Sequence, residues 1–228
     1  MTDVDSAVKL IEDRIGYCFK DKNFIKEALT HSSFANERKI NKLSCNERLE
    51  YLGDAVLELV SSDHIFRNYP SMPEGRMSKF RASLVCEEAL AQCAERIGLG
   101  TLIFLGKGEE QSGGREKPSV TSDAFEALIG ALYMDGGLDT ARNFIMEHVL
   151  KNAEEHLVTA DPKSALQEKV QGMGHETIEY RVVSETGPEH DKSYSVELLI
   201  GGKVSGSGTG RSKKLAEKEA ALEALRRL

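Results

Sequence analysis

Apolar residues recur at helical spacing from Val4 to about Leu157, and no run in this part of the chain shows sustained strand alternation. Proline and glycine interrupt the pattern, chiefly near residues 70–75, 98–100 and 136–137. The stretch 106–118 is polar and rich in glycine, which predicts a flexible loop. Helices are expected at about 4–15, 22–31, 45–67, 77–97, 119–134 and 138–156. The pattern therefore predicts an all-α domain over residues 1–156.

The pattern changes after Thr159. Asp161 followed by Pro162 is typical of a capped helix start, and this helix should run to about residue 171. Gly201-Gly202 fits a tight hairpin between two strands. Strand-like runs lie at 177–184, 193–200 and 203–209, and a last helix covers about 212–227. The order α-β-β-β-α predicts a small α+β domain over residues 161–228, after a short linker near 156–161.

Composition excludes several classes of protein. The N-terminus carries acids instead of a basic region followed by an apolar run, so neither a signal peptide nor a transit peptide is expected. No apolar stretch approaches the roughly 20 residues that span a bilayer. The four cysteines form no CxxC pair and have no histidine at zinc-like spacing, which favours reduced thiols in a cytoplasmic protein. We expect no membrane partner and no organic cofactor.

The net charge of −7 at first argues against a nucleic-acid partner. Residues 160–228, however, hold 11 basic and 11 acidic residues and are neutral. The first 159 residues hold the other 19 basic and 26 acidic residues, so all the excess acid lies there. The helical domain therefore contains acids that need an explanation.

Part of that acid lies on one face of the predicted helix at 45–67. Glu47, Glu50 and Asp54 fall within about 60° of one another at 100° per residue, opposite a predicted core-facing apolar stripe that includes Leu59. A solvated polar face is the simpler interpretation. However, like charges at these spacings repel unless a cation compensates, and Arg48 points elsewhere.

A second carboxylate pair, Asp123 and Glu126, is surrounded by small and apolar residues, which makes unpaired acids expensive. A position in the first helical turn would explain Asp123, but Glu126 lies too far along the helix. Glu74, in a turn before another helix, indicates nothing alone. Carboxylates without Cys or His ligands suit hard cations, so Mg²⁺ is expected, with Mn²⁺ as a substitute. Such a site can activate water against a phosphodiester.

The second domain has features of a phosphate-binding surface. Lys213 and Lys214 lie in the first turn of the last helix, where they oppose the helix dipole, unless the turn serves as a phosphate site. Two merely solvated lysines remain the alternative. Polar groups that could contact duplex RNA lie on the first helix, in the loop after the first strand and, more weakly, in the loop at 107–117; they are Gln167, Glu168, His190 and Arg115.

Four motifs, in order, resemble those of the bacterial ribonuclease III family. They are THSSF at 30–34, NERLEYLGDAVL at 46–57, PEGRMSKFRASLV at 73–85 and DAFEALIGALYMDGG at 123–137. The resemblance covers essentially the entire chain, including a C-terminal double-stranded-RNA-binding domain. It implies a metal-dependent homodimer with one site per subunit along a shared valley. Each site would cut one strand, leaving 5′-phosphate and 3′-hydroxyl ends with a short 3′ overhang, in the processing of precursor ribosomal and messenger RNA.

The resemblance also implies residue roles. Glu126 would be a direct metal ligand, and Asp54 would organise the metal and the attacking water. The family often has Phe where this chain has Tyr51, and buries it in the partner subunit, so the Tyr51 hydroxyl would need a partner there. Metal or catalytic roles fall to Glu50, Asp54, Asp123 and Glu126, with supporting roles for Glu47 and Glu74.

Two alternatives remain open at this point. A non-catalytic dimeric protein that binds double-stranded RNA should have lost at least one of the four principal acids, and all four are present. A helical domain that binds metal without cutting RNA would leave the RNA-binding tail without a purpose.

Overall fold

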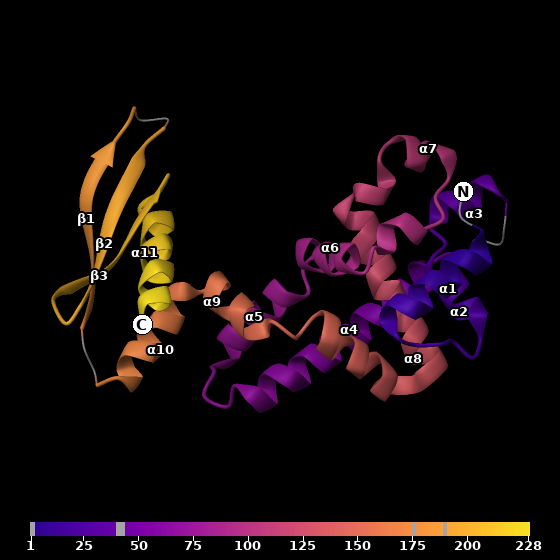
Figure 1. The fold of residues 1–228 in the computed structure, drawn as a ribbon, viewed down its shortest axis with the longest axis horizontal. Coiled ribbons are helices and arrows are strands. Elements are labelled where there is room, and N and C mark those ends of the chain that lie inside the picture. The colour runs from indigo at the N-terminus through magenta and orange to yellow at the C-terminus, as the bar shows by residue number, and fades with distance from the viewer. Residues whose placement is uncertain (1–2, 40–43, 175–176, 189–190) are drawn as a thin grey trace. The chain divides into compact units, whose positions relative to one another are not determined.

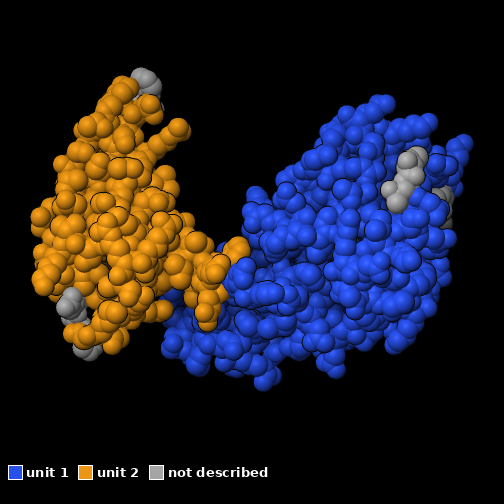
Figure 2. Space-filling view, in the orientation of Figure 1, with its two compact units in different colours: residues 1–153 blue, residues 154–228 orange. Residues whose placement is uncertain are grey.

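A computed structural model describes residues 3–39, 44–174, 177–188 and 191–228 of the chain (Figure 1). Internal contacts divide the chain into two compact units, residues 1–153 and 154–228 (Figure 2). Each unit is described by itself.

The described part of the first unit is built from helices, which confirms the predicted all-α class. It begins with α1 (Val4–Ile15), α2 (Lys22–Ala28) and the short α3 (Ser32–Glu37), which the sequence pattern did not predict. The remaining elements are α4 (Glu47–Asn68), α5 (Glu74–Leu84), α6 (Glu87–Arg96), η1 (Leu99–Leu102), α7 (Lys107–Gln111), η2 (Gly114–Glu116) and α8 (Pro118–His148). A further helix, α9 (Ala153–Ala160), occupies the stretch where a linker was expected.

Helices α4 and α8 form the centre of this unit and cross with their backbones in contact. A Cβ atom added at Gly53 would lie 1.8 Å from the backbone oxygen of Glu126, and one at Gly130 would lie 2.1 Å from that of Leu49. Only glycine leaves room for this approach. Fully buried side chains such as Leu57 and Phe125 surround the crossing. The two helices that carry the predicted acids are therefore held face to face.

The end of the apolar part of α8 anchors the segment before α2. The Asp135 carboxylate accepts hydrogen bonds from the Tyr17 hydroxyl at 2.6 Å and from the backbone N–H groups of Lys20 and Asp21 at 2.9 and 2.8 Å. Gly137 then adopts φ 78°, which kinks α8 at the predicted break. The Asp-Gly-Gly sequence is thus explained by packing.

Two predictions about this unit were wrong. The expected single helix at 77–97 is divided into α5 and α6, and Glu87 and Glu88 lie in the favourable first turn of the second helix. The stretch 106–118 is also ordered into α7 and η2. Lys117 Nζ lies 2.7 Å from Glu109, and Arg115 Nε lies 2.6 Å from Glu110, so ion pairs hold together a segment whose composition predicted flexibility.

The second unit contains α10 (Pro162–Gly172), β1 (Ile178–Thr186), β2 (Ser193–Ile200), β3 (Lys203–Gly210) and α11 (Lys213–Arg227), which confirms the α-β-β-β-α order. The strands form an antiparallel sheet in the order β1-β2-β3. Leu166 and Val170 of α10 join Leu198 and the alanine face of α11 in one core. Glycines of β3 let α11 approach closely, since a Cβ at Gly208 would lie 2.3 Å from the Ala216 oxygen.

Candidate active site and RNA-binding surfaces

Three carboxylates from α4 and α8 converge beside the glycine crossing. Glu50, Asp123 and Glu126 each offer one oxygen, and these oxygens all lie within 4.8 Å of one another. Glu50 lies one turn before Gly53, whereas Glu126 supplies the backbone oxygen that Gly53 faces. The close helix crossing therefore brings together acids that are more than 70 residues apart in the sequence.

The electrostatics of this cluster are unfavourable for three ionised acids. Burial, followed by the charges of Asp54, Glu50 and Asp123, raises the pKa of Glu126 to about 8. Burial and the neighbouring acids, Asp123 first among them, raise the pKa of Glu50. Burial also raises the pKa of Asp123. Among the described residues no Lys or Arg forms an ion pair with any of these three side chains.

This arrangement fits a bound cation. The donors are all carboxylate oxygens, which hard divalent ions prefer, and they are half-buried, so the charge that they share is poorly screened by water. A cation between them would offset the repulsion that raises their pKa values.

Asp54 and Glu47 lie on α4 next to this cluster but are not part of it. Both side chains are exposed, although the charge of Asp54 is the strongest that Glu126 feels and Glu47 raises the pKa of Glu50. Glu47 also lines a small cavity with Ser32 and Asn36. The acidic face expected from α4 is thus present, with Glu50 as its member in the close group.

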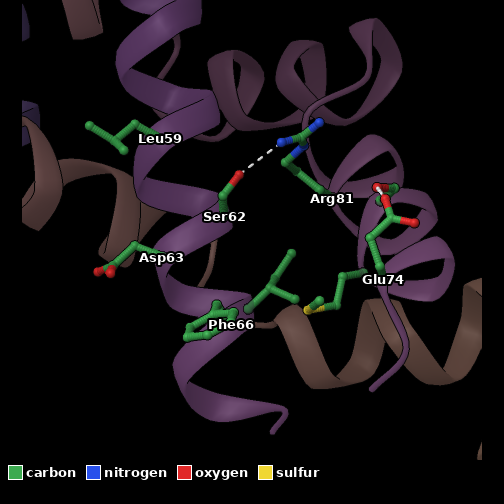
Figure 3. A pocket seen from close by; sticks show the side chains of 9 residues that line it. Leu59, Ser62, Asp63, Phe66, Glu74 and Arg81 are labelled. Carbon is green, nitrogen blue, oxygen red and sulfur yellow. Dashed lines mark hydrogen bonds between the residues drawn. The ribbon is translucent and has the colours of Figure 1, made fainter. Parts of the chain in front are cut away.

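Glu74 lies at a different place, on the first residue of α5. Its carboxylate accepts a hydrogen bond from the Ser78 hydroxyl at 2.8 Å, and it lines a cavity of about 400 Å³ between α4 and α5 (Figure 3). Leu59 and Phe66 of α4 line the same cavity, together with Arg81. Arg81 links the two helices through Ser62 at 2.8 Å and Glu58 at 2.7 Å.

An exposed apolar stripe runs along α4 toward this cavity. The side chains of Tyr51, Leu59 and Phe66 are 82%, 56% and 71% exposed. Leu59 was expected in the core, and this expectation was wrong, because it lies at the edge of the predicted stripe and no helix of the described unit covers it. The spacing of residues 51, 55, 59 and 66 places them on one helix face, a signal that could have identified the surface.

In the second unit the predicted contact residues lie on the surface. Lys213 and Lys214 are exposed in the first turn of α11, where the Ser212 hydroxyl accepts a hydrogen bond from the Leu215 N–H at 3.2 Å. Gln167 and Glu168 are exposed on α10. His190 lies outside the described residues.

The guanidinium of Arg115 is engaged within the first unit. It forms two hydrogen bonds with the Glu110 carboxylate, at 2.6 and 2.7 Å, and donates to the backbone oxygens of Gly100 and Ile103 at 2.9 Å each. These contacts explain the order of the α7–η2 segment. An RNA contact by Arg115 stays a prediction.

Comparisons with known proteins agree with this arrangement. The family model "Ribonuclease-III-like" matches residues 21–153, and "Double-stranded RNA binding motif" matches residues 162–228. Curated relatives named "Ribonuclease 3" are 46% identical over 228 residues in Pelotomaculum thermopropionicum (99% of this chain, 95% of the relative) and 48% over 222 residues in Oceanobacillus iheyensis (96% of each).

A solved nuclease domain of ribonuclease III from Campylobacter jejuni, described as flexible in a region involved in dimer formation, is 43% identical. It covers 64% of this chain and 97% of its own length, with a TM-score of 0.59. None of the helices in the described residues is long and apolar enough to cross a membrane. By its sequence relatives and by both family models, the chain belongs to the ribonuclease III family.

Proposed function

We propose that this protein is an endoribonuclease that hydrolyses phosphodiester bonds in double-stranded RNA with a divalent metal. The observation that carries the proposal is the convergence of Glu50, Asp123 and Glu126 without a cationic partner among the described residues. The chain combines this site with a double-stranded-RNA-binding motif. The proposed boundaries are residues 1–156 for the endonuclease domain and 161–228 for the RNA-binding domain.

The metal would be held by Glu50, Asp123 and Glu126, with Asp54 at the edge of the cluster. Mg²⁺ suits the all-carboxylate donors, and Mn²⁺ should substitute. A metal ion in such a site supplies an activated water and stabilises the charge that develops on the phosphate. Glu126 must lose its proton before it can act as a ligand, so binding should release protons below about pH 8. Asp54 and Glu47 would orient the attacking water and the substrate.

The apolar stripe on α4 supports a homodimer. An aromatic side chain that is 82% exposed, as Tyr51 is, gains most from burial in a partner subunit. The cavity lined by Leu59 and Phe66 is a matching apolar recess (Figure 3). Because Glu74 lies at this cavity and not at the metal cluster of its own chain, its supporting role would be exercised beside the interface.

The second unit would bind the duplex through three regions. Lys213 and Lys214 at the start of α11 would contact phosphates, since a helix N-terminus and two ammonium groups point to the same ligand. The other proposed contacts are Gln167 and Glu168 on α10, His190 and, in the first unit, Arg115. The products would carry 5′-phosphate and 3′-hydroxyl ends with a short 3′ overhang. We assign the protein to the cytoplasm and to the processing of precursor ribosomal RNA and other structured RNAs.

A cleavage assay on a long RNA duplex with Mg²⁺ tests this function. The wild-type chain should produce short fragments, and Glu126→Gln should cut about a thousandfold more slowly, because the loss of a ligand removes several kcal/mol of transition-state stabilisation. Glu126→Gln should still bind the duplex. Glu88→Gln, a change at an exposed acid of α6, is the matched control and should cleave normally.

An intact duplex after incubation of the wild-type chain with Mg²⁺ or Mn²⁺ would refute the enzyme. Tight binding in that case would instead establish the non-catalytic alternative.

A further inference from the structure

The first turn of α11 contains a lysine whose position is electrostatically unfavourable unless something else holds it there. Lys213 follows the N-cap Ser212, where the helix dipole repels a cation. Among the described residues its ammonium has no carboxylate within ion-pair distance. It lies instead 5.7 Å from the centre of the Tyr194 ring, within the range of a cation–π contact.

The fold of the sheet explains why these two side chains meet. Tyr194, near the start of β2, pairs with Gly210 at the end of β3. A Cβ at Gly210 would lie 2.8 Å from both the backbone nitrogen of Ala216 and the Cβ of Leu215, so the missing side chain lets the start of α11 approach the sheet. Tyr194 is only partly buried and packs against the core. The Tyr194 ring thus lies between the core and the Lys213 ammonium.

A second pair of charges lies beside this contact. Glu185 of β1 is the cross-strand partner of Tyr194, and it forms an ion pair with Lys192 at 2.7 Å. The hydrogen bond with Lys192 lowers the pKa of Glu185, and the nearby charge of Lys213 and a hydrogen bond with Tyr194 act in the same direction. The carboxylate is therefore held ionised on the side of the ring next to Lys213.

The same unit contains a useful contrast. Lys163 lies 4.4 Å from the centre of the Tyr180 ring, but its ammonium is also 2.6 Å from the Glu217 carboxylate and is neutralised there. Lys213 has the ring without a carboxylate at ion-pair distance. It therefore keeps a charge available for an external anion while its flexible side chain is restrained.

We propose that Tyr194 is a positioning residue that holds the Lys213 ammonium in place for a phosphate of the RNA duplex. A restrained lysine loses less conformational entropy when it binds than a free one does. This inference rests on the proposed RNA binding of the second unit. Lys214, which has no ring contact or ion pair among the described residues, contacts phosphate without such help.

A double-mutant cycle on the full chain tests the proposal. The probe is a blunt RNA duplex of about 20 base pairs, longer than the roughly 16 that such a domain spans, with EDTA present to prevent cleavage. Tyr194→Leu should weaken binding about two- to fivefold, the effect of an exposed cation–π contact. Tyr194→Phe keeps the ring and should bind like the wild type. In the Lys213→Ala background Tyr194→Leu should have no further effect.

The Lys214→Ala background is the matched control, in which Tyr194→Leu should keep its full effect. An equal loss with and without Lys213, or a Phe variant as weak as the Leu variant, would show that Tyr194 only supports the core. The wild-type chain offers a measurement that needs no destabilising variant. Ring currents should shift the NMR signals of the Lys213 side chain upfield, and unshifted signals would overturn the contact.

Failure of the positioning role is distinguishable from failure of the proposed function. If replacing Lys213 and Lys214 weakens duplex binding but the cycle shows no coupling, only the role of Tyr194 is wrong. If the wild-type chain does not bind the duplex, both proposals are overturned.

Discussion

The acidic cluster of the first unit and the basic helix start of the second unit are opposite solutions to the recognition of a polyanion. The cluster gathers like charges in a half-buried place, from helices distant in the sequence, and its carboxylates have raised pKa values. The helix start exposes Lys213 and Lys214, which are adjacent in the sequence. The first can meet RNA only through a cation, whereas the second can meet a phosphate directly.

This difference also separates what each region requires of the fold. The acidic cluster depends on the contact of two helix backbones at Gly53 and Gly130. The lysines need only a helix that begins at the right residue, although Tyr194 restrains one of them. We therefore expect the cluster to be sensitive to packing and the helix start to be sensitive to salt.

The largest effect should come from Gly53→Ala. The new Cβ would lie 1.8 Å from the Glu126 backbone oxygen, so α4 and α8 would have to separate, at a cost of at least about 3 kcal/mol of unfolding free energy. Urea denaturation measures this. Gly75→Ala is the matched control, because nothing lies within 4 Å of its Cβ position, and it should not destabilise the protein. Equal stability of both variants would contradict the close crossing.

The next effect concerns the surface that the acidic unit presents to a second copy. Tyr51→Ala should raise the dimer dissociation constant about 30-fold, as the loss of a central aromatic anchor does. Sedimentation equilibrium measures this, and Leu10→Ala on α1, also exposed, should leave it unchanged. If Tyr51→Ala dimerises like the wild type, the stripe on α4 is not the interface.

A smaller effect is expected at the basic helix start. Replacing Lys213 and Lys214 by alanine should weaken duplex binding about tenfold at moderate salt and reduce the slope of log affinity against log salt by about 2. Each lost phosphate contact releases fewer counterions. Titrations of a fluorescent duplex over a range of salt concentrations measure this slope. An unchanged slope would mean that the phosphates are bound elsewhere.

The smallest effect is a pH dependence of the acidic cluster. The pKa of Glu126 is about 8 in the folded chain and near 4.5 in the unfolded chain, so its contribution to stability is complete below pH 4.5 and is lost as the pH rises through 8. With EDTA, the wild-type chain should lose about 1 kcal/mol more than Glu126→Gln between pH 5 and pH 8, allowing for solvent screening. Urea denaturation at several pH values measures this, and Mg²⁺ should restore the loss at pH 8. Identical pH profiles would show that Glu126 is not perturbed.

The sequence by itself determined the class of both units and the identity of the acids. Helical periodicity predicted α4 within two residues at each end, and strand alternation predicted β2, because local periodicity decides which face of an element is apolar. The family motifs identified Glu50, Asp123 and Glu126 before any geometry was known. The order of α7 and η2 could not be predicted, since ion pairs, and not apolar spacing, hold that segment.

Only the tertiary structure decided how these acids are arranged. Helical spacing placed Glu47, Glu50 and Asp54 on one face of α4, but the crossing with α8 decided that Glu50 joins Asp123 and Glu126 in the close group. It also showed that Glu74 lies at the apolar cavity and that Leu59 is exposed. The physical reason is that a period along one helix fixes directions about its own axis, whereas distances between helices depend on how closely their backbones pack.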